Sequence, residues 1–265
     1  MIKRSTPVIV GNWKTTPETL DMAKKFIKQL DKKCEVLSSG GGSKSIVKFP
    51  KKSYFIAVPD IFIPNLKPLA KRGYIGAQNV SSSSVGQITG TVTPSQILTG
   101  GADFTIIGHS EVRSRGELVE ERARKVALAL QSKLTTVLCF GENTRDKNGN
   151  YLKEIEDDVK KTLALVDRKF FDNLIIAYEP VWAIGSVVPA TSSECFEVVI
   201  ALRRALASLV GIDYAKKVQV LYGGAVAPDN AKNFLEEGGV DGLLIGRASQ
   251  DVSSFLEILT SCYEK

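Results

Sequence analysis

The sequence predicts an α/β fold, a (β/α)8 barrel in which eight parallel strands are ringed by helices. Short apolar runs recur along the chain, at residues 8–11, 54–58, 74–78, 104–108, 136–140, 174–178, 218–222 and 242–245. Stretches of helical periodicity lie between them, for example at 117–132 and 193–210. Strands that are apolar throughout are typical of a parallel sheet covered by helices, and eight such units close naturally into a barrel. A doubly wound open sheet is the main alternative.

Capping residues indicate where helices begin. Thr16 precedes Pro17, and Thr93 precedes Pro94 with Gln96 placed to complete a capping box. Threonine accepts a hydrogen bond from the first turn, and proline suits the first helical position. We therefore expect helices to start at these two points.

Residues 36–52 interrupt the alternation of strands and helices. A serine- and glycine-rich stretch, 38–43, is followed there by basic residues. We expect a flexible surface insertion between the first helix and the second strand. Its glycines and Lys44 resemble a P-loop only superficially, because the Gly-Lys-Ser/Thr order is absent.

The composition predicts a single globular domain spanning residues 1–265. Hydrophobic residues make up 43% of the chain and charged residues 24%, which allows a large core. Barrels of this kind reach about 250 residues as one domain. No apolar run is long enough to span a bilayer or to form a signal peptide, so we expect no membrane association.

The cysteines indicate the cellular compartment, and the charge indicates which partners are expected. Cys34, Cys139, Cys195 and Cys262 show no metal-binding or disulfide spacing, so the cytoplasm is the expected compartment. The net charge is +6, but lysines gather between Lys24 and Lys52 without interleaved aromatic residues. This pattern favours a solvated surface over a nucleic-acid site, and the charge also suits a phosphorylated small molecule.

Polar residues follow the apolar runs at the points where a barrel builds its active site. They are Asn12 and Lys14, Gln78 and Asn79, His109 and Glu111, and Glu179. Each alone has a structural explanation, such as a turn cap or a solvated charge. Together, a cation, an imidazole and a carboxylate can hold an anion, polarise a carbonyl and move a proton. His109 is the only histidine in the chain.

Glycines follow the last two runs. Gly223 and Gly224 come after the seventh run and Gly246 after the eighth. Barrels often bind phosphate there with backbone N–H groups, because glycine lets the backbone approach closely. Ordinary turns are the alternative for each glycine taken alone.

Six ordered motifs now show a family resemblance. They are residues 11–14 (GNWK), 76–79 (GAQN), 108–111 (GHSE), 139–142 (CFGE), 178–185 (YEPVWAIG) and 222–224 (YGG). The chain closely resembles the triosephosphate isomerase family over nearly its whole length, apart from the insertion. The resemblance implies interconversion of dihydroxyacetone phosphate and D-glyceraldehyde 3-phosphate through an enediolate, in glycolysis and gluconeogenesis.

The resemblance also implies roles for the residues at the strand ends. Glu179 is expected to be the general base, and His109 a neutral electrophile, a use of imidazole for which this family is the standard example. Lys14 is expected to anchor the phosphate and the enediolate, Asn12 to hydrogen-bond the substrate, and Glu111 to position Lys14. No metal and no organic cofactor are implied.

A lid over the substrate is implied as well, and the family is again the standard example of its motion. The lid residues are Pro180, Val181, Trp182, Ala183, Ile184, Gly185 and Ser186, within the segment 180–191. Gly185 is expected to bind the phosphate together with Ala225, Gly246 and Arg247. Tyr222 is expected to latch the closed lid through the backbone of Ala190.

The chain departs from the family pattern at the phosphate end. Ala225 replaces the usual serine and Arg247 the usual second glycine, and Ser186 begins a different lid continuation. Loss of a hydrogen bond to a charged group costs about 1.5–3 kcal/mol, which predicts weaker substrate binding unless another group compensates. Arg247 either adds a cation near the phosphate or points outward.

A homodimer is the expected assembly, by resemblance. The loop 81–92 carries Val85, Ile88 and Val92, and in the family it inserts into a neighbouring subunit beside the first strand. Val112 and Thr91 stand where the family has a charged Arg and Glu, and losing both members together avoids a stranded charge. A non-catalytic barrel, and a barrel isomerase acting on a ribose phosphate, are the alternative functions.

Overall fold

Eight parallel strands close into a barrel in the computed structural model, which describes residues 6–39, 47–86, 88–184 and 189–264. The strands are β1 (Val8–Asn12), β2 (Tyr54–Ala57), β3 (Gly73–Ala77), β4 (Phe104–Ile107), β5 (Thr135–Phe140), β6 (Leu174–Tyr178), β7 (Gln219–Tyr222) and β8 (Gly242–Ile245). They pair in sequence order, and β1 also pairs with β8. This last pairing confirms the predicted barrel and rules out the open sheet.

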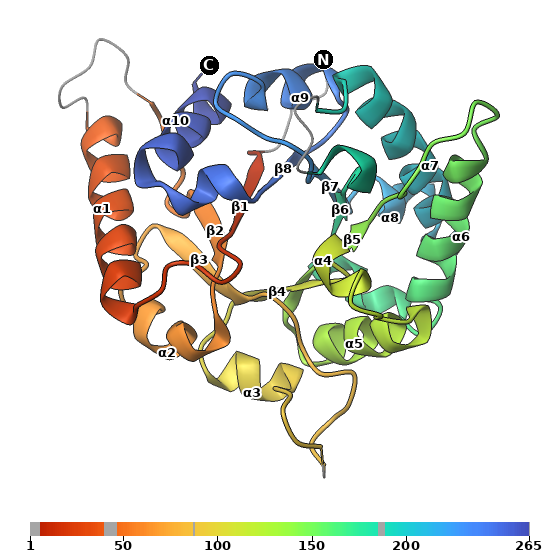
Figure 1. The fold of residues 1–265 in the computed structure, drawn as a ribbon, viewed down its shortest axis with the longest axis horizontal. Coiled ribbons are helices and arrows are strands. Elements are labelled where there is room, and N and C mark those ends of the chain that lie inside the picture. The colour runs from red at the N-terminus through yellow and green to blue at the C-terminus, as the bar shows by residue number, and fades with distance from the viewer. Residues whose placement is uncertain (1–5, 40–46, 87, 185–188, 265) are drawn as a thin grey trace.

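Helices surround the strands, as Figure 1 shows in a view down the barrel. The α-helices are α1 (Leu20–Ser38), α2 (Ile63–Leu66), α3 (Pro94–Thr99), α4 (Ser110–Arg113), α5 (Val119–Gln131), α6 (Asn150–Leu163), α7 (Ser192–Val210), α8 (Ile212–Ala215), α9 (Ala231–Glu237) and α10 (Val252–Tyr263). Short 3-10 turns are η1 (Asp60–Phe62), η2 (Arg168–Asn173), η3 (Val181–Ala183) and η4 (Arg247–Gln250).

Two hydrophobic clusters explain why the strands are apolar on both faces. One contains residues from alternate strand positions, among them Val8, Val10, Phe104 and Ile106. Neighbouring positions such as Ile9 belong to a larger cluster with the helices. Successive side chains of a strand point to opposite faces, so the first cluster fills the barrel and the second lies under the helices.

Of the two predicted helix starts, the one at Thr93 is confirmed and the one at Thr16 is wrong. Thr93 caps α3 with a complete capping box to Gln96, as predicted. The first helix begins later than predicted, because Thr19 and not Thr16 accepts the capping hydrogen bond, from the Met22 N–H. Thr16 instead donates its hydroxyl to the Trp13 carbonyl, 2.7 Å away.

The segment predicted as an insertion, 36–52, is joined closely to the barrel at both ends. Helix α1 continues to Ser38, so the first residues of this segment are helical. Val47 and Phe49 are buried in the larger cluster. Residues 40–46 lie outside the described residues.

Candidate active site

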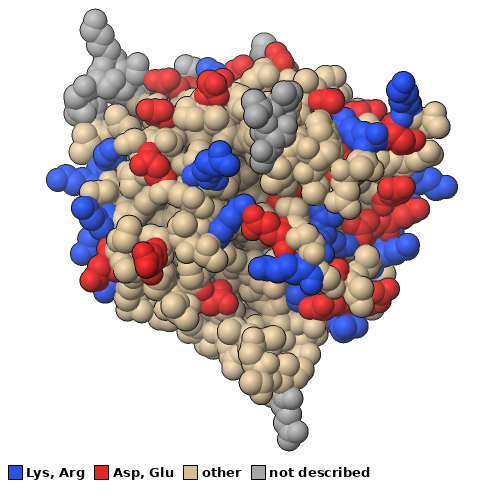
Figure 2. All heavy atoms as spheres, viewed as in Figure 1, with Lys and Arg blue, Asp and Glu red and all other residues tan. Residues whose placement is uncertain are grey.

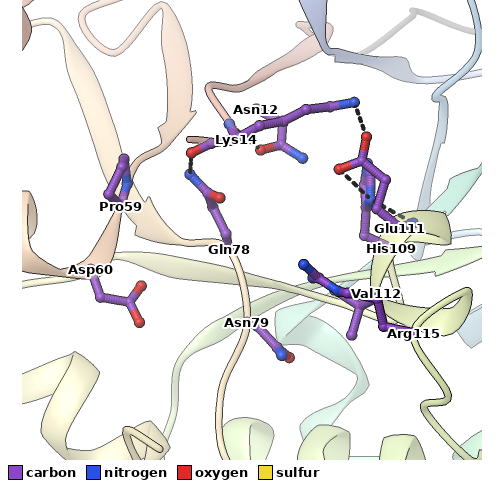
Figure 3. A pocket seen from close by; sticks show the side chains of 10 residues that line it. All are labelled: Asn12, Lys14, Pro59, Asp60, Gln78, Asn79, His109, Glu111, Val112 and Arg115. Atoms are coloured by element: carbon purple, nitrogen blue, oxygen red, sulfur yellow. Dashed lines mark hydrogen bonds and ion pairs between the residues drawn. The ribbon is translucent and has the colours of Figure 1, made fainter. Parts of the chain in front are cut away.

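The polar residues predicted at the strand ends gather at one end of the barrel. Asn12 ends β1, His109 comes two residues after β4, and Glu179 directly follows β6. The carboxyl ends of parallel strands form a single rim. A pocket of about 230 Å³ opens there (Figure 3), lined by Asn12, Lys14, Pro59, Asp60, Gln78, Asn79, His109, Glu111, Val112 and Arg115.

Hydrogen bonds of the Lys14 backbone hold this residue at the rim. Its φ of 54° lies in the left-handed region, which is uncommon for a residue other than glycine. Its N–H donates to Asn12 Oδ1 (3.0 Å), and its carbonyl accepts from Gln78 Nε2 (2.6 Å). Such a conformation persists where the surroundings fix it, and it is often found at functional sites.

The Lys14 side chain forms an ion pair with Glu111, which Figure 3 shows across the upper side of the pocket. Partial burial of Glu111 works to raise the pKa of this carboxyl, but the hydrogen bond and the charge of Lys14 lower it overall. Glu111 therefore stays ionised at neutral pH and orients the ammonium group of Lys14. Figure 2 shows basic and acidic side chains next to each other at the centre of this face.

His109 and Glu179 are in direct contact. Nε2 of His109 lies 3.1 Å from Glu179 Oε1, and the two side chains are 10% and 1% exposed. The other carboxylate oxygen of Glu179 accepts the Ser110 N–H (2.8 Å). The only histidine of the chain and a fully buried carboxylate thus meet at the rim.

The hydrogen bonds of His109 assign its proton. Nδ1 accepts the backbone N–H of Glu111 (3.2 Å), so Nδ1 carries no proton. Nε2 is then the protonated nitrogen and donates to Glu179. A singly protonated imidazole is neutral, so His109 presents an uncharged N–H donor at this rim.

The glycines after β7 and β8 pack directly on these residues. A Cβ at Gly223 would lie 3.1 Å from Cγ of Glu179, and one at Gly246 would lie 3.7 Å from Cε of Lys14. Gly224 is tighter still, since a Cβ there would lie 2.2 Å from the Tyr222 hydroxyl. The predicted phosphate-binding turns therefore border both the carboxylate and the ammonium group.

The comparison with known families agrees with this geometry. The model of the family described as triosephosphate isomerase matches residues 7–262. The chain belongs to the triosephosphate isomerase family.

Full-length triosephosphate isomerases are similar to the chain from end to end. The protein of Leptospira biflexa serovar Patoc is 36% identical over 256 residues, which cover 95% of this chain and 98% of that protein. The protein of Citrifermentans bemidjiense is 37% identical over 258 residues, covering 96% and 97%. The protein of Leifsonia xyli subsp. xyli is 34% identical over 262 residues, covering 97% of each. The predicted family is confirmed.

The predicted lid is described in part. Residues 180–184 leave the rim after Glu179, with η3 at Val181–Ala183. Gly185 and Ser186 lie outside the described residues. Burial raises the pKa of the Tyr222 hydroxyl, and the nearby backbone N–H of Ala190 opposes this rise. Within the described part of the chain, the Tyr222 hydroxyl has no hydrogen bond of ordinary geometry, to Ala190 or to any other residue.

The predicted phosphate end carries two side chains that depart from the family pattern, Ala225 and Arg247. Ala225 is fixed through its carbonyl, which accepts from Asn230 Nδ2 (3.0 Å). Arg247 opens η4 with an exposed side chain, and no hydrogen bond or ion pair joins it to any residue that the structure describes. Its guanidinium group is thus available to an anion.

Val112 and Thr91, which stand where the resemblance implies a charged pair, are both uncharged. Val112 lines the pocket. Thr91 donates its hydroxyl to Ser81 Oγ (3.2 Å) within its own loop. Neither Val112 nor Thr91 therefore needs an ionic partner.

Two charged residues of the pocket, Asp60 and Arg115, were not predicted from the sequence. Asp60 comes three residues after β2, and an acidic residue just past an apolar run was the signal that could have identified it. Burial raises the pKa of Asp60 to about 6, against the opposing hydrogen bond from the Gln78 backbone. Arg115 lies past α4, where no local pattern points to the pocket.

The residues that the structure describes lack two further features. Within them, no group of three or more His, Cys, Asp and Glu side chains could hold a metal ion. No helix among them has the length and apolar character needed to cross a membrane.

Proposed function

We propose that this chain is an isomerase that interconverts dihydroxyacetone phosphate and D-glyceraldehyde 3-phosphate, and that its site is the rim around His109 and Glu179. It acts in glycolysis and gluconeogenesis. The observation that carries the assignment of the site is the 3.1 Å contact between the neutral imidazole and the buried carboxylate. The ammonium group of Lys14 lies on the same rim.

Proton transfer is the task of Glu179. The carboxylate takes a proton from the carbon next to the carbonyl and returns it to the neighbouring carbon, with an enediolate between the two steps. The hydroxyl proton of the substrate passes from one oxygen to the other in the same reaction. The substrate oxygen replaces Glu179 as the acceptor of the His109 Nε2–H, which frees the carboxylate to act as the base. A carboxylate and an imidazole suffice for this reaction, so it needs no metal or organic cofactor.

Charge stabilisation is the task of His109, Lys14 and Asn12. The enediolate carries negative charge on oxygen, and fixed donors aimed at that charge supply a large share of such rate enhancements. Glu111 positions the lysine through the ion pair. Because Lys14 is held by its backbone hydrogen bonds, its charge needs little rearrangement when the substrate binds.

The substrate phosphate binds at the glycine turns. Gly185, Ala225 and Gly246 supply backbone N–H groups, and Arg247 supplies a cation from the start of η4. The lid, residues 180–186, excludes water, and Tyr222 latches it through Ala190. The exposed and unpaired state of Arg247 among the described residues supports its part in this proposal.

The assembly proposed is a homodimer in the cytoplasm. The loop 81–92 exposes Val85 (78%) and Ile88 (53%), which a partner subunit can cover. Figure 1 shows the segment between β3 and α3 reaching beyond the ring of helices, and Figure 2 shows this projection without charged side chains. The four cysteines are free thiols, which suits a reducing compartment.

The deciding experiment is a coupled steady-state assay with glyceraldehyde 3-phosphate, run on the purified chain and on His109→Gln. We expect turnover in the wild type and a loss of about 10²-fold or more in the variant, because the electrophile is removed. Circular dichroism of both proteins checks that they are folded.

The negative outcomes distinguish the alternatives. A folded wild-type chain without turnover would favour a non-catalytic barrel. Turnover of ribose phosphates in a panel of sugar phosphates, without turnover of triose phosphates, would assign a different isomerase. Full activity of His109→Gln would remove His109 from the mechanism while leaving the activity itself in place.

A further inference from the structure

A buried polar cluster lies behind the rim, at the ends of β5 and β6. Glu142, two residues after β5, is 6% exposed. Its Oε1 atom accepts three hydrogen bonds, from the Tyr178 hydroxyl (2.9 Å), from Trp182 Nε1 (2.8 Å) and from Arg145 Nε (2.8 Å). One carboxylate oxygen thus joins the loop after β5 to the residues at and after the end of β6. Neither Glu142 nor Arg145 has a part in the proposed chemistry.

Arg145 contacts the residues that lead into the predicted lid. Its Nη2 atom donates to the Tyr178 hydroxyl (2.8 Å), and Tyr178 directly precedes Glu179. Its guanidinium carbon lies 5.0 Å from the centre of the Trp182 ring and 4.8 Å from that of Tyr151. A planar cation between aromatic rings forms favourable cation–π contacts. Its side chain is only 16% exposed, so these contacts are poorly screened by water.

The same guanidinium group contacts the residues that follow the predicted lid. It donates to the Glu194 carbonyl (3.3 Å) and lies 3.6 Å from Glu194 Oε1 and 3.9 Å from Glu197 Oε2. Glu194 in turn accepts the Thr191 N–H (2.7 Å) in the capping box that starts α7. Arg145 therefore lies between residues 180–184 on one side and 189–194 on the other.

The cluster is connected to Glu179 through the backbone. The N–H of Glu179 donates to the Phe140 carbonyl (2.7 Å), and that of Val181 donates to the Glu142 carbonyl (3.1 Å). A Cβ at Gly141 would lie 1.7 Å from the Glu179 carbonyl oxygen, so the backbones of Gly141 and Glu179 are in close contact. A shift at the start of the 180–184 segment is thereby transmitted to the carboxylate.

We propose that Arg145 is a positioning residue for the isomerase reaction. It fixes the position of Trp182 relative to Glu194. In this way it determines where residues 180–184 leave the barrel and where residues 189–191 return to it. This inference rests on the proposed function of the rim. Arg145 touches neither substrate nor reacting atoms and acts through Trp182, Glu142 and Glu194.

Two variants test the proposal. Arg145→Ala removes every contact of Arg145, and it also leaves the buried Glu142 carboxylate without a cation, which destabilises the fold. Arg145→Lys keeps a positive charge near Glu142 but lacks the planar fork that reaches both sides. Arg168→Ala is the matched control, because Arg168 is exposed and stacks on Tyr214 (4.2 Å) away from the cluster.

Steady-state kinetics is the first measurement. We expect kcat to fall about 10- to 100-fold in Arg145→Ala, since misplacement of a catalytic group by about 1 Å costs up to about 10²-fold. Arg145→Lys is expected to fold as stably as the wild type and still to lose about tenfold in kcat. Arg168→Ala is expected to retain the wild-type kcat and KM.

Fluorine NMR of 5-fluorotryptophan protein is the second measurement. The chain has two tryptophans, and Trp182→Phe identifies the Trp182 resonance. We expect this resonance to shift or broaden in both Arg145 variants and that of Trp13 to stay in place. The spectrum does not depend on turnover, so it judges the inference even if the wild type proves inactive.

Three outcomes overturn the proposal. The first is kcat within about twofold of wild type in both Arg145 variants. The second is a raised KM with unchanged kcat, which marks a residue that contributes to substrate binding alone. The third is a Trp182 resonance identical to wild type. An inactive wild type would contradict the proposed function and leave the spectroscopic test of Arg145 intact.

Discussion

Ala225 departs from the family pattern and belongs to the proposed phosphate site. Its backbone is held by Asn230, so a serine hydroxyl placed there would start from a fixed Cα. A hydrogen bond to a charged group is worth about 1.5–3 kcal/mol. We predict that Ala225→Ser lowers KM for glyceraldehyde 3-phosphate by about tenfold, measured in the coupled assay, with little change in kcat.

Arg247 determines how this result is interpreted. If its guanidinium group makes up for the missing hydrogen bond in full, Ala225→Ser leaves KM unchanged and Arg247→Gly raises it, more strongly at low salt because exposed charges are screened by ions. If Ala225→Ser lowers KM and Arg247→Gly has no effect, Arg247 points outward. An increase of KM in Ala225→Ser contradicts the predicted hydrogen bond.

Asp60 gives a prediction about pH and stability. Burial raises the pKa of this carboxyl to about 6 in the folded chain, from its ordinary value of 3.8. Between these values the folded state binds a proton that the unfolded state does not, so stability falls as pH rises from about 4 to 6 and then stays level. Burial of the charge thus costs free energy at neutral pH.

The variant Asp60→Asn removes that cost. We predict that it raises the free energy of unfolding by about 1–3 kcal/mol at pH 8, and that the difference disappears toward pH 4. Urea denaturation at both values, at one protein concentration, measures it. Asp213→Asn, at an exposed carboxylate, is the control. A difference between wild type and Asp60→Asn that grows as the pH falls would contradict the assigned direction.

At the scale of single elements, the strands were predicted well because burial on both faces leaves a strong apolar signal. The runs 174–178 and 242–245 coincide with β6 and β8. The run 74–78 is displaced by one residue, since β3 begins at Gly73 and Gln78 lies past its end. The Gln78 side chain serves Lys14 instead, a contact between distant residues that no local pattern contains.

Helix starts were predicted less reliably. Thr93 was identified because threonine, proline and glutamine stand together at capping-box spacing. Thr16 and Thr19 both precede plausible first turns, and what decides between them is the Trp13 carbonyl that takes up the Thr16 hydroxyl. The end of α1 was also placed too early, because Ser38 reads as a loop residue. Its hydroxyl bonds back to the Cys34 carbonyl inside the helix.

The candidate site exists only at the scale of the whole molecule. Asn12 and Glu179 are far apart in sequence, and the pairing of β1 with β8 closes the ring that brings their strand ends to one rim. The polar residues that directly follow apolar runs in the sequence were correctly predicted to lie at this rim. It could not predict that His109 donates to Glu179, or that Asp60 and Arg115 line the same pocket, because those contacts depend on how the loops fold over the barrel.

The proposed dimer extends the same argument beyond one chain. The loop 81–92 exposes Ile88, and the family resemblance places this loop beside the first strand of a neighbouring subunit. We predict that the wild type sediments as a dimer at micromolar concentration and that Ile88→Asp sediments as a monomer, because a buried and unpaired carboxylate at the interface is costly. Sedimentation velocity measures both proteins.

Activity is expected to fall together with assembly. Lys14 is held in an uncommon backbone conformation by contacts within one chain, and a partner loop beside the first strand adds to that constraint. We therefore expect monomeric Ile88→Asp to lose kcat/KM by about tenfold or more, as for other misplaced catalytic groups. Ile212→Asp is the control, because Ile212 is also exposed (65%) but lies on α8. A dimeric Ile88→Asp, or a monomeric wild type, would contradict the proposed interface.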